Sequence, residues 1–132
     1  MATTRTKRIR CYARSAMYRA KAAADVRDWK AAGREFQSCM RQFMSSLCEH
    51  YGAKPKRDTL RGMLAALVRS PQCETDGAPH MRDAIAMSEQ MIAGEKVNRD
   101  EAVVHLFYVN DFMNGSDEIE LPRRGEPADW KW

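Results

Sequence analysis

The sequence of 132 residues lacks the features that mark a membrane protein. Its longest nearly apolar run, from Ala102 to Val109, is interrupted by His105, whereas a membrane-spanning helix needs roughly 20 predominantly apolar residues. The basic start of the chain is not followed by the apolar stretch of a secretory signal peptide. We therefore expect a chain that does not span a membrane and that resides in the cytoplasm.

Metal-binding and common catalytic motifs are absent as well. The four cysteines form no Cys-x-x-Cys pair and no disulfide framework, which argues against structural zinc and suits a reducing compartment. The sequence contains no Gly-rich phosphate loop, no Gly-x-Ser-x-Gly elbow and no His-Glu-x-x-His motif. We expect no metal, no cofactor and a non-enzymatic protein.

The sequence does contain five segments with helical periodicity of apolar residues. Its length suits one domain, and its 44% hydrophobic and 30% charged residues are ordinary for a folded soluble chain. The segments predict an all-α, single compact bundle of four to five helices with a short irregular C-terminal tail. The predicted helices cover residues 7–26, 29–51, 58–69, 79–93 and 98–113. A flexible basic arm (1–6), a bundle (7–115) and a docked tail (116–132) make up the predicted organisation.

Capping residues mark two of these helices. Asp28 is a favourable N-cap for the second helix, and Gly52 suits its C-terminal end. Asn98, followed three residues later by Glu101, predicts the start of the fifth helix. The apolar residues of the fifth helix lie nearly all round it, so we expect it to be the central and most buried element.

Positive charge is concentrated at the start of the chain. Residues 1–34 hold ten lysines or arginines and only two acidic residues, whereas the other 98 hold 12 basic and 16 acidic residues. Intervals of three, four and seven would place several of these cations on one stripe of the first helix, where they could bind phosphates. The expected contacts to nucleic-acid backbone are Lys7, Arg8, Arg10, Arg14, Arg19 and Lys21. The alternative is a solvated helix face, or one neutralised by the acidic residues at 117–120.

Two tryptophans stand near the end of the chain. Trp130 and Trp132 would expose a large apolar area if they remained in solvent. We therefore expect them to pack on this domain's own surface or to bind a partner.

One constellation resembles a known family. The pattern resembles the first three helices of HEPN domains, which are small helical bundles that include ribonucleases and nucleotide-binding accessory modules. The residues that carry it are Tyr12, Arg19-Ala20-Lys21, Asp28-Trp29-Lys30-Ala31-Ala32, Phe36, Phe43-Met44, Leu47, Tyr51-Gly52 and Asp58-Thr59-Leu60. Arg99-Asp100 and His105 fit the family's Arg/His motif. The resemblance implies that Arg99 stabilises phosphate charge and His105 moves protons in a metal-independent ribonuclease.

Three functions from different classes follow. The first is a non-enzymatic helical module that contacts nucleic-acid backbone or an acidic partner surface through its first helix. Such a module would be a subunit or accessory of a larger nucleoprotein assembly, for example a CRISPR effector. The second is the HEPN-like ribonuclease. The third is an inhibitor encoded by a phage or mobile element that acts by protein–protein binding. A steep dependence of binding on salt would favour the first over the third.

Overall fold

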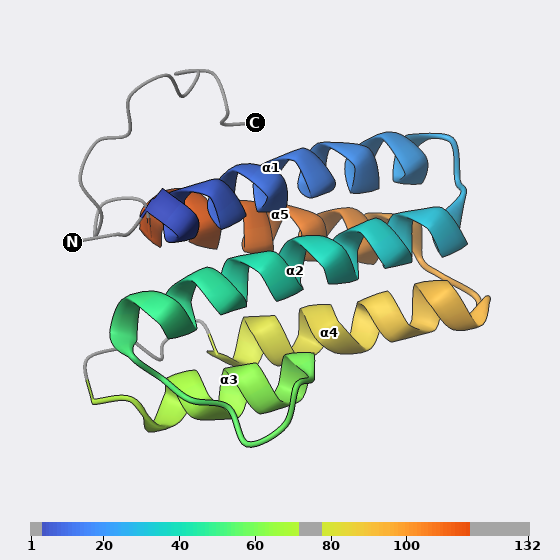
Figure 1. Ribbon diagram of the computed structural model, residues 1–132. Helices are drawn as coiled ribbons and strands as arrows, with labels where there is room; N and C mark the ends of the chain where they lie inside the picture. Colours follow the sequence, from blue (N-terminus) through green and yellow to red (C-terminus); the bar gives the residue numbers. More distant parts are fainter. Residues whose placement is uncertain (1–3, 72–77, 117–132) are drawn as a thin grey trace.

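The computed structural model describes the backbone of residues 4–71 and 78–116 and, within them, the side chains of residues 12–71 and 78–113. These residues form five α-helices and no strand (Figure 1). The helices are α1 (Thr4–Asp25), α2 (Trp29–Tyr51), α3 (Leu60–Arg69), α4 (Ala78–Ala93) and α5 (Arg99–Ser116). The predicted all-α bundle is confirmed. No described helix is long and apolar enough to cross a membrane.

The predicted caps are present. The Asp28 carboxylate accepts a hydrogen bond from the Ala31 amide at 3.3 Å, and Gly52 ends α2 in the left-handed conformation with φ 65°. Asn98 Oδ1 accepts from the amides of Asp100 and Glu101 at 2.9 and 3.2 Å. These bonds satisfy backbone groups that a helix end leaves unpaired.

Three boundaries differ from the prediction by two residues or more. The first helix begins at Thr4 rather than Lys7, so residues 4–6 belong to a helix and not to a flexible arm. The third helix begins at Leu60 rather than Asp58, because the Thr59 hydroxyl caps it by accepting from the Gly62 amide at 3.0 Å. The last helix continues past residue 113 to Ser116.

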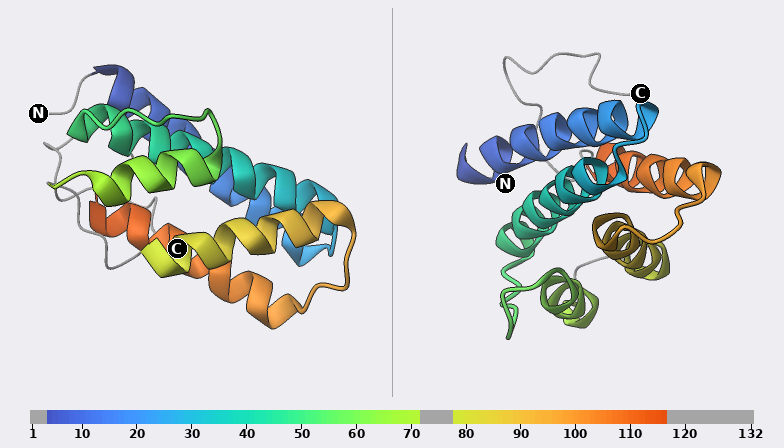
Figure 2. Two further views of the ribbon diagram at one scale, coloured as in Figure 1. Left: turned by 90° about the horizontal axis from the view of Figure 1, so that it is seen from below. Right: turned by 90° about the vertical axis from the view of Figure 1, so that its right-hand side faces the viewer.

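The central element is α2 and not α5. The second helix contacts all four other helices, while the described parts of α1 and α3 do not touch each other. Figure 2 shows α1 on one side of α2 and α3 on the other. The expectation that α5 is the most buried helix is wrong, because α5 lies at the margin of the bundle and exposes Val103, Val104, Phe107 and Tyr108.

Small residues and methionines make the tight packing around α2 possible. α1 presents fully buried alanines toward its neighbours, among them Ala13, Ala16 and Ala20. On the other side, a Cβ added at Gly33 would lie 2.8 Å from Ile92 Cγ1 of α4, so only glycine allows this approach. The core also contains buried methionines from several helices, and their unbranched side chains fill irregular gaps. They include Met17, Met40, Met63, Met81 and Met91.

Candidate nucleic-acid interface

The cations predicted on the first helix are not all at the surface. Arg14 is only 5% exposed, so the prediction that it lies on an open stripe is wrong. The physical reason is that α1 packs against both α2 and α5, which makes its buried arc wider than the alanine stripe alone suggests. Burial removes Arg14 from contact with an external phosphate.

The structure describes the side chains of only two of the other predicted contacts on α1, Arg19 and Lys21. Arg19 is exposed, but its Nε forms an ion pair with Glu35 of α2 at 2.9 Å. Lys21 is exposed. Lys7, Arg8 and Arg10 belong to the helical backbone of α1, and their side chains lie outside the described residues. The surface proposed from the sequence is therefore reduced to Lys21, the ion-paired Arg19 and these three residues.

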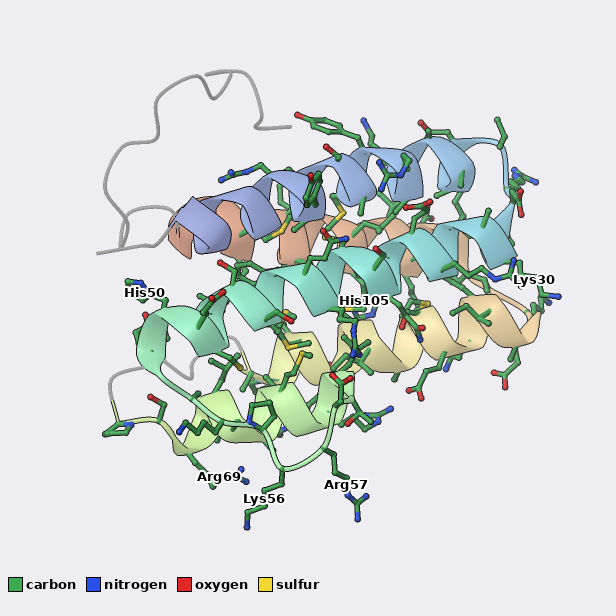
Figure 3. The ribbon with its side chains drawn as sticks, viewed as in Figure 1. Lys30, His50, Lys56, Arg57, Arg69 and His105 are labelled. Atoms are coloured by element: carbon green, nitrogen blue, oxygen red, sulfur yellow. The ribbon has the colours of Figure 1, made fainter. Side chains whose placement is uncertain are left out.

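A second basic segment, which the sequence analysis missed, surrounds α3. Residues 53–71 hold five basic residues and one acidic residue. Four of the cations are exposed and form no ion pair with any residue that the structure describes: Lys54, Lys56, Arg57 and Arg69. We call these four residues the α3 basic surface. Figure 3 shows three of them, Lys56, Arg57 and Arg69, pointing outward at the lower edge of the molecule, with Lys30 at the other end of the bundle.

The missed segment had a signal in the sequence. When charge is summed over all residues after position 34, the acidic residues elsewhere in that part of the chain conceal the cluster. Counting charge over residues 53–71 alone shows the excess directly, because this segment holds five basic residues and one acidic residue.

A cavity of about 660 Å³ opens beside this surface. Its walls come from α2, from the connection between α2 and α3, from the first turn of α3 and from α4. The lining residues are Gln37, Arg41, Arg57, Asp58, Thr59, Leu60, Arg61, Gly62, Ile85 and Glu89. The cavity therefore brings together three arginines from three different segments, with Leu60 and Ile85 as its apolar part.

Two of these arginines are held by carboxylates of the cavity wall. Arg41 of α2 forms an ion pair with Asp58, and Arg61 of α3 forms one with Glu89 of α4. Each guanidinium carries several N–H donors in a rigid plane, so an ion pair fixes its orientation without using all of them. Arg57 has no ion pair among the described residues. The arrangement suits an anion that is bound by charge-assisted hydrogen bonds, such as a phosphate.

The backbone around Arg57 is held tightly against α3. A Cβ added at Gly62 would lie 2.4 Å from the Arg57 carbonyl oxygen and 3.0 Å from Thr59 Oγ1. The absence of a side chain at Gly62 therefore lets the connection pack on the first turn of α3. This close packing holds the Arg57 backbone beside the first turn of α3, and Arg57 is one of the residues that line the cavity.

The Arg/His pair of the alternative ribonuclease is not brought together within one chain. The fifth helix is continuous from Arg99, so Arg99 and His105 are separated by about 9 Å along the axis and about 240° around it. Arg99 is exposed, while His105 is half-buried with its Nδ1 out of solvent. In one chain, these two side chains cannot converge on one phosphate.

The described cysteines do not form a reactive or metal-binding site. Cys39 is fully buried, its Sγ lies 3.7 Å from Met113 Sδ, and burial raises the pKa of its thiol far above the ordinary value. Cys48 is also buried. Among the described residues, no three His, Cys, Asp or Glu side chains are grouped so that they could hold a metal ion. Cys39 and Cys48 act as small apolar residues of the core.

The predicted partner-binding residues Trp130 and Trp132, and the tail from residue 117 onward, lie outside the described residues. Comparisons of the chain with protein-family models, with curated proteins and with solved structures found no match. The assignment of a function therefore depends on the geometry of the described residues.

Proposed function

We propose that this protein is a non-enzymatic helical module that binds nucleic-acid backbone through the α3 basic surface, with one phosphate in the adjacent cavity. Contacts to phosphates position a protein on a nucleic acid without reading its sequence. The module would therefore bind strands of different sequence with similar affinity, as a subunit or accessory of a larger nucleoprotein assembly.

The observation that supports this proposal is that Arg41, Arg57 and Arg61, from three different segments, all line one cavity. Phosphate binding sites favour arginine because its planar group offers two parallel N–H donors to two phosphate oxygens. Lys54 and Lys56 extend the positive charge from the cavity along the connection between α2 and α3, and Arg69, the last residue of α3, extends it to the far end of that helix. That helix is about 15 Å long, so the surface spans several phosphates of one strand.

The first helix remains a second candidate surface. Lys21 is exposed, and Lys7, Arg8 and Arg10 stay a prediction from the sequence. Because α1 and α3 lie on different sides of α2, the two surfaces can be tested separately.

The test measures binding of short fluorescein-labelled RNA, single-stranded DNA and duplex DNA by fluorescence anisotropy over a series of salt concentrations. The intact chain is compared with the double variant Lys56→Glu/Arg57→Glu. We expect the affinity of the variant to fall by about tenfold or more at low salt. The slope of log affinity against log salt should decrease by about 0.7 for each phosphate of a single strand that the variant no longer neutralises.

A matched control is available on the other end of α2. The double variant Lys30→Glu/Arg34→Glu changes the net charge by the same amount, and both residues are exposed. We expect it to retain most of the affinity and the original slope. Equal losses in the two double variants would show that only the net charge matters and would overturn the assignment to α3. Binding that does not depend on salt would overturn the proposal as a whole.

A further inference from the structure

The cavity beside the α3 basic surface is larger than one phosphate needs. Its volume of about 660 Å³ falls within the range of roughly 300–1,000 Å³ that is usual for sites that hold a whole small molecule. A phosphate group alone would occupy a small part of that space. The rest is available to a further part of the same ligand, and the chemistry of the walls indicates which part.

The charge of the walls fits one phosphodiester. The lining residues include three arginines, one aspartate and one glutamate, so one positive charge within the cavity is not compensated. An internal phosphate of a strand carries one negative charge, whereas a terminal phosphate carries about 1.5 to 2 at neutral pH. The balance therefore favours an internal nucleotide, with its phosphate beside Arg57, which forms no ion pair with any described residue.

Arg41 and Arg61 provide flat surfaces on which a base can stack. Their ion pairs with Asp58 and Glu89 hold both groups in place, yet the two arginine side chains remain 44 and 57% exposed. A carboxylate binds the edge of a guanidinium, so the planar face stays available, and unpaired bases stack on such planes. Because the ion pairs already restrain the two side chains, a ligand loses less free energy in ordering them.

The apolar part of the cavity suits the other side of a base. Leu60 begins α3 and is half-buried, whereas Ile85 of α4 is only 2% exposed, which places it at the inner end of the cavity. Apolar contact and stacking are available to every base, because each base has a flat aromatic face. These walls are therefore compatible with binding that does not read sequence.

We infer that the cavity takes one whole unpaired nucleotide, with its phosphate beside Arg57 and its base against the arginine planes and the apolar part. The protein then prefers single strands to duplexes. In a duplex the bases are paired and stacked inside the helix, and moving one out costs free energy that is least for a single strand. The inference rests on the proposed function, because it extends the phosphate that we assign to this cavity.

Binding of single-stranded and duplex DNA of equal length tests this preference. Backbone contacts alone favour the duplex, because it carries one negative charge for about every 1.7 Å of its axis. We expect the intact chain to bind a fluorescein-labelled single strand several-fold more tightly than the duplex, as measured by anisotropy. A strand of abasic residues keeps the backbone charge, and its affinity should be lower by about fivefold or more.

The variant Leu60→Ala tests whether the base lies in this cavity. It removes part of the apolar wall without a change of charge, so the affinity for the normal strand should fall by about threefold or more. The affinity for the abasic strand should stay the same. Val68→Ala is the matched control, because Val68 lies on the same helix, is 37% exposed and does not line the cavity. It should leave both affinities unchanged, and circular dichroism checks that each variant is folded.

Three results would overturn the inference: equal affinities for the normal and abasic strands, tighter binding of the duplex, or equal effects of Leu60→Ala and Val68→Ala. The proposed function would still stand if Lys56→Glu/Arg57→Glu reduced the affinity and the salt slope. Binding that does not depend on salt would overturn both.

Competition with adenosine monophosphate distinguishes a nucleotide of a strand from a free nucleotide. We expect this compound to displace the labelled strand far less effectively than an unlabelled strand does, because it cannot also reach the lysines of the α3 basic surface. Equal displacement by the two competitors would assign the cavity to a free nucleotide and would overturn the inference.

Discussion

The first helix and the segment around α3 are both rich in cations, but the fold uses their charge differently. In α1, Arg14 is buried and Arg19 is paired with Glu35. Around α3, Lys54, Lys56 and Arg57 remain exposed, and the nearby carboxylates of Asp58 and Glu89 are already paired with other arginines. The comparison teaches that the density of charge in a segment does not give the charge that a ligand can reach. The accessible charge depends on whether a helix packs against neighbours on one side or on two sides.

The largest expected effect comes from reversing the buried charge of α1. We expect Arg14→Glu to lower the free energy of unfolding by about 3–5 kcal/mol, because it leaves an uncompensated charge in the interior. Urea denaturation followed by circular dichroism measures this change. The exposed Lys21→Glu serves as the control and should cost about 1 kcal/mol or less. A small effect at Arg14 would mean that this side of α1 is open after all.

A side chain at Gly62 should affect both stability and binding. Gly62→Ala places a Cβ against the Arg57 carbonyl oxygen, and we expect a loss of about 1–3 kcal/mol from this overpacking. Because the connection must move, the affinity for labelled RNA should fall as well. Gly33→Ala is the matched control, since it also overpacks a helix contact but should leave the affinity unchanged. If both variants bind RNA like the intact chain, the position of Arg57 does not matter for binding.

Removing one exposed cation tests the contribution of the α3 basic surface to binding. We expect Lys56→Ala to reduce the salt slope of single-stranded RNA binding by about 0.7 and to weaken binding equally for all sequences. Lys30→Ala should have no effect on the slope. The same anisotropy titrations measure both. A loss that depends on the RNA sequence would argue for base contacts in place of backbone contacts.

The smallest effect should come from the ion pair between α1 and α2. Arg19 is more than half exposed, and exposed ion pairs contribute about 0.2–1 kcal/mol. Arg19→Ala should therefore change the free energy of unfolding by no more than this amount. A double-mutant cycle with Glu35→Ala measures the coupling between the two side chains. A coupling of several kcal/mol would show that the pair is shielded from solvent.

The helices themselves could be predicted because their signals are local. Asp28, Gly52 and Asn98 act through backbone groups within a few residues, so a single sequence is enough to identify them. The apolar stripe of α2 was equally clear, because its spacing allows no other regular structure of that length.

The candidate site could not be predicted because it depends on contacts between distant segments. The apolar residues of α5 lie on two sides of the helix, and the sequence does not say which side the bundle covers. Arg14 is buried in a helix that packs against both α2 and α5, and α5 lies about 90 residues further along the chain. The cavity combines Arg41, Arg57 and Arg61 with Glu89, and only the crossing of α2, α3 and α4 brings them together.

The burial of the methionines determines when oxidants can reach them. Met17, Met40 and Met91 are completely shielded from solvent in the native bundle. Oxidants reach such thioethers only in unfolded or newly made chains, where each sulfoxide replaces an apolar side chain with a polar one. A chain oxidised before it folds would then have to bury these polar groups around α2. Rapid folding, or repair by a sulfoxide reductase, would determine how much of the protein survives.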